Sequence, residues 1–196
     1  MRNLKIGWRY WFPGVVCFSL LSAGMARGAE PTAFELIKEG NRYVGEQSKD
    51  KVLEIRSEKS VGGLVPSVWH LVYFDPDATS KRVEIKFGGG RQMGEKRAWR
   101  PFGGGGAADK IMDLTKLKVD SDRAIKIATA EPLLEKLTIK ATELRLEGSA
   151  TTPVWKVRLW AGKLSKPSVM VDLGDIFISA EGGEVVKSEL RIDKAA

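Results

Sequence analysis

The sequence predicts an α+β fold of two related α-β-β-β units, each with a helix packed on an antiparallel sheet. Three observations support this prediction. Two segments carry an apolar stripe at helical spacing, and several others alternate apolar with polar residues, as half-buried strands do. In addition, Trp69 and Trp155 stand 86 residues apart in similar strand-like surroundings. Similarity at a fixed offset is typical of a duplicated unit.

The first unit is predicted for residues 29–90. Thr32-Ala33-Phe34-Glu35 has the spacing of a helix-initiating capping box, and an apolar face follows it through Gly40 and Val44. Three alternating segments come next, at residues 53–55, 69–73 and 83–87. Because each of them is apolar on one side only, we expect the helix to cover one face of a three-stranded sheet.

The second unit is predicted for residues 119–196. Its helix begins at Asp120, with acidic residues at the positive end of the helix dipole, and ends at Pro132. In the first strand, the apolar residues change parity between Ala141 and Leu144. This change predicts a β-bulge near Thr142, and the alternative is a strand that is buried differently along its length. Further alternating strands follow, and the last two form a hairpin around a Gly-Gly turn.

Residues 91–118 are predicted to be a glycine-rich basic linker between the units. The segment interleaves arginine and lysine with Trp99 and Phe102. Its first residues are able to complete a hairpin, but the remainder is too rich in glycine for a regular element. An anionic surface partner is the alternative to a simple connection.

Residues 1–28 have the organisation of a secretory signal peptide. A basic start precedes a short apolar run, and Ala26-Arg27-Gly28 offers a small-x-small cleavage site. The apolar run is shorter than the ~20 residues that a membrane-spanning helix needs. We therefore expect a cleaved leader, a periplasmic or secreted protein, and no transmembrane segment in the mature chain. Acylation of Cys17 in a lipoprotein is the alternative.

Removal of the leader changes the charge argument. The leader carries four of the 32 basic residues and none of the 25 acidic ones, so the net charge falls from +7 to +3. Clustered basic residues bind nucleic acid by displacing counterions from phosphates. Because the mature chain is only mildly basic, we expect no nucleic-acid partner.

Few residues are suited to catalysis or metal binding. The chain has one histidine, His70, and one cysteine, Cys17, so a zinc site or a Cys–His pair lacks its partners. His70 is expected at the rim of a strand. Asp172 and Asp175 lack the loop spacing of a calcium site and are expected at a solvated strand end. We expect no enzyme activity, no catalytic residues, no cofactor and no metal.

Trp160 differs from the other strand tryptophans. Trp69 and Trp155 occupy equivalent positions and are expected in the core, whereas Trp160 shares the opposite face with Lys156 and Arg158. Trp160 is therefore either covered by the linker or exposed as a contact residue. On the second alternative, Lys156, Arg158 and Trp160 are the candidate residues for contact with a partner.

Three motifs of the second unit form a pattern: Asp120-Ser-Asp-Arg-Ala at the helix start, Pro153-Val-Trp-Lys-Val-Arg-Leu-Trp160, and Asp175-Ile-Phe-Ile-Ser-Ala-Glu-Gly-Gly-Glu-Val-Val-Lys187. Residues 120–193 thereby resemble the PepSY domain family, and residues 30–90 resemble a more distant copy. Tandem copies are similar in plan to the β-lactamase inhibitor proteins. The resemblance implies a small exported helix-on-sheet module without catalytic residues, associated with peptidase propeptides and with regulation of cell-envelope peptidases. It transfers no site residues.

We therefore expect an exported, non-enzymatic binding module that binds or regulates peptides or peptidases in the cell envelope. Contact would use a sheet edge or the face with Lys156, Arg158 and Trp160. The alternative is a structural envelope component whose basic linker contacts anionic glycan or lipid. The sequence leaves open which oligomer forms and whether the two sheets make one continuous surface.

Overall fold

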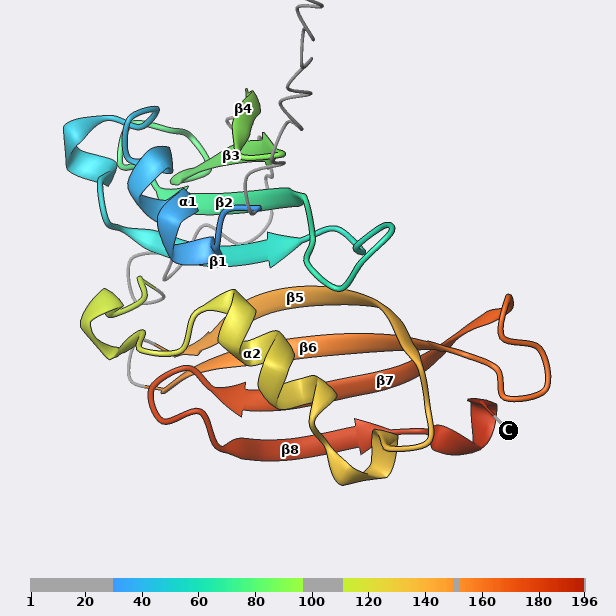
Figure 1. The fold of residues 1–196 in the computed structure, drawn as a ribbon. Helices are drawn as coiled ribbons and strands as arrows, with labels where there is room; N and C mark the ends of the chain where they lie inside the picture. The colour runs from blue at the N-terminus through green and yellow to red at the C-terminus, as the bar shows by residue number, and fades with distance from the viewer. Residues whose placement is uncertain (1–29, 97–110, 150–151, 196) are drawn as a thin grey trace, which may run out of the picture.

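The strands form a single eight-stranded antiparallel sheet, and both helices lie on one face of it (Figure 1). The computed structural model describes residues 30–96, 111–149 and 152–195, so the predicted leader lies outside it. The elements, with η for a short 3-10 helix, are α1 (Ala33–Gly40), η1 (Glu46–Ser48), β1 (Val52–Ser57), β2 (Val68–Phe74), β3 (Arg82–Gly88), β4 (Arg91–Lys96), η3 (Leu114–Lys116), α2 (Ser121–Thr129), η4 (Pro132–Leu134), β5 (Ile139–Ser149), β6 (Thr152–Gly162), β7 (Met170–Ser179), β8 (Val185–Leu190) and η5 (Ile192–Ala195).

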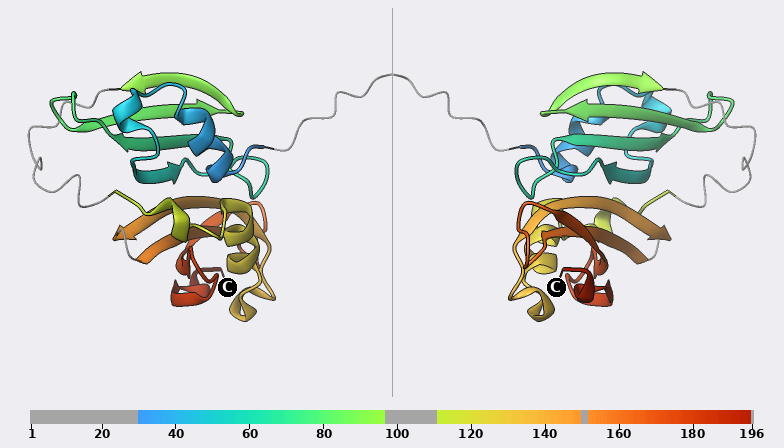
Figure 2. Two further views of the ribbon diagram at one scale, coloured as in Figure 1. Left: turned by 90° about the vertical axis from the view of Figure 1, so that its left-hand side faces the viewer. Right: turned by 90° about the vertical axis from the view of Figure 1, so that its right-hand side faces the viewer.

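The sheet is wound outward from its centre. Its strand order is β4-β3-β2-β1-β5-β6-β7-β8, so each half of the chain begins at the middle and ends at an edge. In the end-on views of Figure 2, strands β1–β4 lie above strands β5–β8. The halves join where β1 pairs with β5, through Ile55 opposite Leu146 and Arg56 opposite Arg145.

The predicted α+β fold of two helix-on-sheet units is wrong. The protein is mainly β, because all eight strands belong to one sheet and the two helices have only eight and nine residues. Each half supplies four strands instead of three. The physical reason is that two separate sheets would leave β1 and β5 as edges with unpaired N–H and C=O groups, and their pairing removes both edges. The alternating pattern identifies strands and their faces, but not their neighbours.

Serine side chains continue the junction where the β1–β5 ladder ends. The Leu144 N–H donates to Ser57 Oγ and the Thr142 N–H donates to Ser60 Oγ, both at 2.9 Å. The Ser60 N–H in turn donates to the Thr142 carbonyl at 2.8 Å. The two bonds that the hydroxyls accept are buried, so the serines satisfy N–H groups of β5 that would otherwise be costly to bury.

The starts of the two helices also connect the halves. The predicted capping box of α1 is confirmed: Thr32 Oγ1 accepts from the Glu35 N–H, and the Glu35 carboxylate accepts from the Thr32 N–H. At the start of α2, Ser121 Oγ accepts a hydrogen bond from the Ala33 N–H at 3.0 Å. Ser121, at the start of α2, therefore satisfies a backbone N–H group at the start of α1 that has no partner within its own helix.

One hydrophobic cluster fills the space between the sheet and the helices, and it includes residues of both halves. Trp69 and Trp155 belong to it with 1% and 0% of their surface exposed, which confirms their predicted place in the core. Their indole N–H groups donate to the carbonyls of Pro66 and Val119, at 3.0 and 2.7 Å. The buried indoles thus keep a hydrogen-bond partner.

Two local predictions can be compared with the strands. The register between β5 and β6 shifts between Ile139 and Ala141, but it is continuous from Ala141 to Leu144. The change of parity between these two residues is therefore not the predicted bulge: both are buried, on opposite faces of the sheet. The first residues of the predicted linker form β4 and complete a hairpin with β3. Residues 97–110 of that linker lie outside the described part of the chain. Among the described residues, no helix combines the length and apolar character required to cross a membrane.

Candidate functional site on the face opposite the helices

The face of the sheet opposite α1 and α2, here called the uncovered face, carries charged side chains. On β6, Trp155 and Val157 point toward the helices and are buried, whereas Lys156, Arg158 and Trp160 point the other way and are partly exposed. No helix of the described residues lies on this side (Figure 1). The uncovered face therefore presents polar side chains that no described helix covers.

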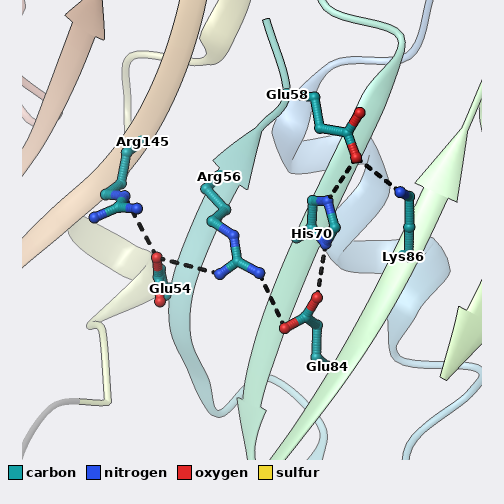
Figure 3. Close-up of polar contacts among 7 residues, drawn as sticks. All are labelled: Glu54, Arg56, Glu58, His70, Glu84, Lys86 and Arg145. Atoms are coloured by element: carbon teal, nitrogen blue, oxygen red, sulfur yellow. Dashed lines mark hydrogen bonds and ion pairs between the residues drawn. The ribbon is translucent and has the colours of Figure 1, made fainter. Parts of the chain in front are cut away.

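Seven side chains form a connected set on this face, here called the central charge cluster (Figure 3): six come from the adjacent strands β3, β2, β1 and β5, and Glu58 directly follows β1. Its members are Glu54, Arg56, Glu58, His70, Glu84, Lys86 and Arg145. Arg56 donates to Glu84 at 3.0 Å and also lies 3.6 Å from Glu54. Arg145 of β5 lies 3.4 Å from the same Glu54 oxygen, so the cluster crosses the junction between the halves.

His70 stands between two carboxylates of this cluster. Its Nδ1 is 2.7 Å from a Glu84 oxygen and its Nε2 is 3.2 Å from a Glu58 oxygen, which Lys86 also contacts at 2.7 Å. The imidazole ring therefore bridges Glu58 and Glu84. The side chain is 14% exposed and lies on an interior strand, which corrects the predicted position at a rim.

The cluster lowers the pKa of both glutamates beside His70. Hydrogen bonds from Lys86 and His70 lower the pKa of Glu58 below its usual range. For Glu84, partial burial raises the pKa, but the hydrogen bond from His70 and the charge and hydrogen bond of Arg56 outweigh it. The pKa of Glu84 therefore also lies below its usual range.

Acid should therefore weaken the fold through this cluster. A carboxylate whose pKa is lower in the folded state adds stability above its unfolded pKa, and that stability is lost as the pH falls through the folded pKa. We expect the urea midpoint of the wild-type chain to fall as the pH drops from about 6 to about 3. At the upper pH, Glu84→Gln should lower the free energy of unfolding by about 1–3 kcal/mol, and its midpoint should fall less on acidification.

The matched control for this prediction is Glu135→Gln, which changes an exposed glutamate outside the cluster. Its pH profile should follow that of the wild-type chain. If the urea midpoint falls equally with pH in the wild-type and Glu84→Gln chains, the cluster does not couple folding to pH.

The three predicted contact residues are each held by a neighbour. Lys156 Nζ lies 3.2 Å from an Asp175 oxygen, and Arg158 Nε lies 3.3 Å from Asp172 and 3.4 Å from Asp175. Asp175 is 8% exposed, so its predicted solvated position is wrong: it is buried beside the two basic side chains. Lys156 and Arg158 therefore already contact neighbouring aspartates in the free protein.

Trp160 is partly buried, and the ammonium of Lys59 lies 4.4 Å from the centre of its ring. This distance is within the range of a cation–π contact. Lys59 belongs to the loop between β1 and β2, so a residue of the first half lies over a tryptophan of the second. The predicted cover by the linker concerns residues 97–110, outside the described residues.

A small pocket of about 140 Å³ opens next to these residues. It is lined by Glu143, Leu144, Arg145, Lys156, Arg158 and Asp175. The pocket connects the central charge cluster, through Arg145, with the contact residues on β6. Among the described residues, no group of three or more His, Cys, Asp or Glu side chains is arranged to hold a metal ion.

Sequence analysis did not find the central charge cluster. The charged residues on the polar side of each predicted strand were visible as an alternating pattern, for example Glu84 and Lys86 on β3. Their mutual contacts depend on strand order and register, which the pattern does not contain. The pairing of β1 with β5 is what brings Arg145 to Glu54.

Comparisons with protein-family models, with curated proteins and with solved structures found no match. The resemblance to the PepSY family therefore stays a prediction.

Proposed function

We propose that the protein is an exported, non-enzymatic binding module that holds a polypeptide partner against its uncovered face. The contact residues are Lys156, Arg158 and Trp160. The observation that carries this proposal is that these three side chains stand in one row on β6, each already ordered by an intramolecular contact. A peptide or peptidase of the cell envelope is the partner that the PepSY resemblance implies.

Order in the free protein favours binding. Fixing a long side chain at an interface costs about 0.5–1.5 kcal/mol, and a side chain that is already held avoids part of that cost. Arg158 Nε lies within ion-pair distance of two aspartates, although it makes no hydrogen bond among the described residues, and 40% of the Arg158 side chain is exposed. Arginine and tryptophan are also the residue types in which binding energy is most often concentrated.

The pocket beside the row indicates what the partner supplies. Its rim combines three basic side chains with two acidic ones, and its volume of about 140 Å³ suits one side chain. Because the basic side chains outnumber the acidic ones by one, the pocket has more hydrogen-bond donors than acceptors. A carboxylate or carboxamide side chain of the partner has the acceptor oxygens that match these donors. The partner is therefore expected to place one such side chain between β5 and β7.

The alternative partner, an anionic glycan or lipid surface, would need a field of one sign. On the uncovered face, acidic and basic residues alternate and pair, as in the ion pairs of Arg56 with Glu84 and of Lys156 with Asp175. The basic linker that the alternative invokes falls mostly on residues 97–110. The described residues therefore favour a polypeptide partner.

The experiment selects binding peptides from a random library with the purified protein, then measures their affinity at low and at high ionic strength. We expect Trp160→Ala and Arg158→Gln to weaken binding by about tenfold or more. Affinity should change little with salt, because paired charges and close contact are screened less than a diffuse basic surface.

The matched control is Lys126→Ala, which removes an exposed charge on α2, on the opposite side of the sheet. It should leave the affinity unchanged, and circular dichroism should show every variant folded. Binding that survives Trp160→Ala and Arg158→Gln, or that disappears at high salt, would contradict the proposal.

A further inference from the structure

We propose that a second copy of this chain binds along β8, so that two sheets join edge to edge into one continuous sheet. This inference concerns a different surface from the uncovered face, and it does not depend on the proposed function. It rests on the exposure of β8, on the direction of its backbone groups, and on a sequence that is complementary to itself.

β8 is an open edge of the sheet. It is the last strand in the order, and five of its six residues are exposed. The Arg191 N–H donates to the Leu173 carbonyl of β7 at 2.7 Å, so the backbone of Arg191 faces inward. Because backbone groups alternate along a strand, those of Glu189 and Lys187 also face inward, and those of Ser188 and Leu190 face outward. The outward groups are free to pair with another strand.

The residues of β8 match their own copy in one antiparallel register. If Ser188 lies opposite Ser188 of the second copy, Lys187 lies opposite Glu189 and Glu189 opposite Lys187. The register of β8 shifts at Val186, so the matched stretch runs from Lys187 to Glu189. Opposite charges directly across two strands are stabilising, and here the twofold symmetry provides the pair twice.

The same register also satisfies the backbone. Ser188 has its N–H and C=O turned outward in both copies, so the central pair exchanges two hydrogen bonds. A shift by one residue would place Lys187 opposite Ser188 or Leu190. Residues whose backbone groups face inward would then lie opposite residues whose groups face outward, and the hydrogen bonds could not form.

An apolar pocket lies at the end of β8 where the second copy would begin. It has a volume of about 330 Å³, and its lining includes Leu133, Leu164 and Ile192. Leu133 and Leu164 are 56% and 57% exposed. Val185 is paired with the buried Ile178, which places it on the helix side of the sheet, and it is 40% exposed. In the proposed register, Val185 of the second copy comes close to the Leu190 end of β8 and to this pocket.

Charged residues usually protect an edge strand from pairing with a copy of itself. A strand with charges of one sign would repel its copy. β8 carries one charge of each sign, and Lys187 already contacts Glu189 at 2.5 Å within one chain. Pairing therefore exchanges one ion pair within each copy for two between the copies, without leaving a charge unpaired.

The test uses two single charge reversals, Lys187→Glu and Glu189→Lys, and sedimentation equilibrium of the purified chains. The wild-type chain should form a dimer. Each variant alone would place like charges opposite one another at two positions, and its dissociation constant should rise by about tenfold or more. An equimolar mixture of the two variants should restore the dimer, because every glutamate then faces a lysine.

The matched control is Lys166→Glu, which makes the same change of charge in the exposed loop between β6 and β7. It should leave the dimer intact. A wild-type chain that stays monomeric, single variants that associate like the wild type, or a mixture that does not associate would each overturn the proposal. Pairing of β8 with an unrelated extended peptide in place of a second copy would overturn it as well.

Discussion

Replacing Trp155 with alanine is expected to lower the free energy of unfolding by about 3–5 kcal/mol, the range for removing a large buried aromatic side chain. The Trp155 side chain is fully buried, and its indole donates to the Val119 carbonyl at the start of α2. The alanine variant loses the packing and leaves that buried carbonyl without its donor. Trp155→Phe keeps most of the volume and should lose less.

The measurement is urea unfolding followed by circular dichroism, with Trp69→Ala as the equivalent change in the first half. Both tryptophans belong to one hydrophobic cluster, so both variants should lower the midpoint of the same single transition. Two separate transitions, one sensitive to Trp69→Ala and the other to Trp155→Ala, would show that the halves fold independently.

Local features of the fold could be predicted from the sequence because local spacing determines them. Thr32 and Glu35 form the capping box that their spacing indicates. The burial of Trp69 and Trp155 could be predicted because each stands on the apolar side of a strand whose residues alternate in polarity. These predictions need no knowledge of which strands are adjacent.

The joining of the halves could not be predicted in this way. It depends on two residue pairs between β1 and β5 and on hydroxyl groups such as those of Ser57 and Ser60. Serine is common on strand ends and turns, so neither residue indicates a long-range role. The candidate site shares this limit: Lys156, Arg158 and Trp160 could be placed on one face, but not their contacts with Asp175 and Lys59.

Shortening either side chain at the junction is the second change with a large expected effect. Ile55 and Leu146 lie opposite each other on β1 and β5, and both are fully buried. Replacing either with alanine should lower the free energy of unfolding by about 2–5 kcal/mol, because each change leaves a cavity in the core. The size of each loss alone does not show that the halves are in contact, since any buried residue would produce it.

The central claim is that the two halves share one sheet through β1 and β5, and a double-mutant cycle of Ile55→Ala and Leu146→Ala tests it most directly. Ile55→Val replaces the first change if the double variant is too unstable to measure. The control cycle combines Ile55→Ala with Ile178→Ala on β7, three strands away, and its effects should add. For the junction pair we expect a coupling energy of about 0.5–3 kcal/mol. Losses that simply add at Ile55 and Leu146, as they do in the control, would contradict the shared sheet.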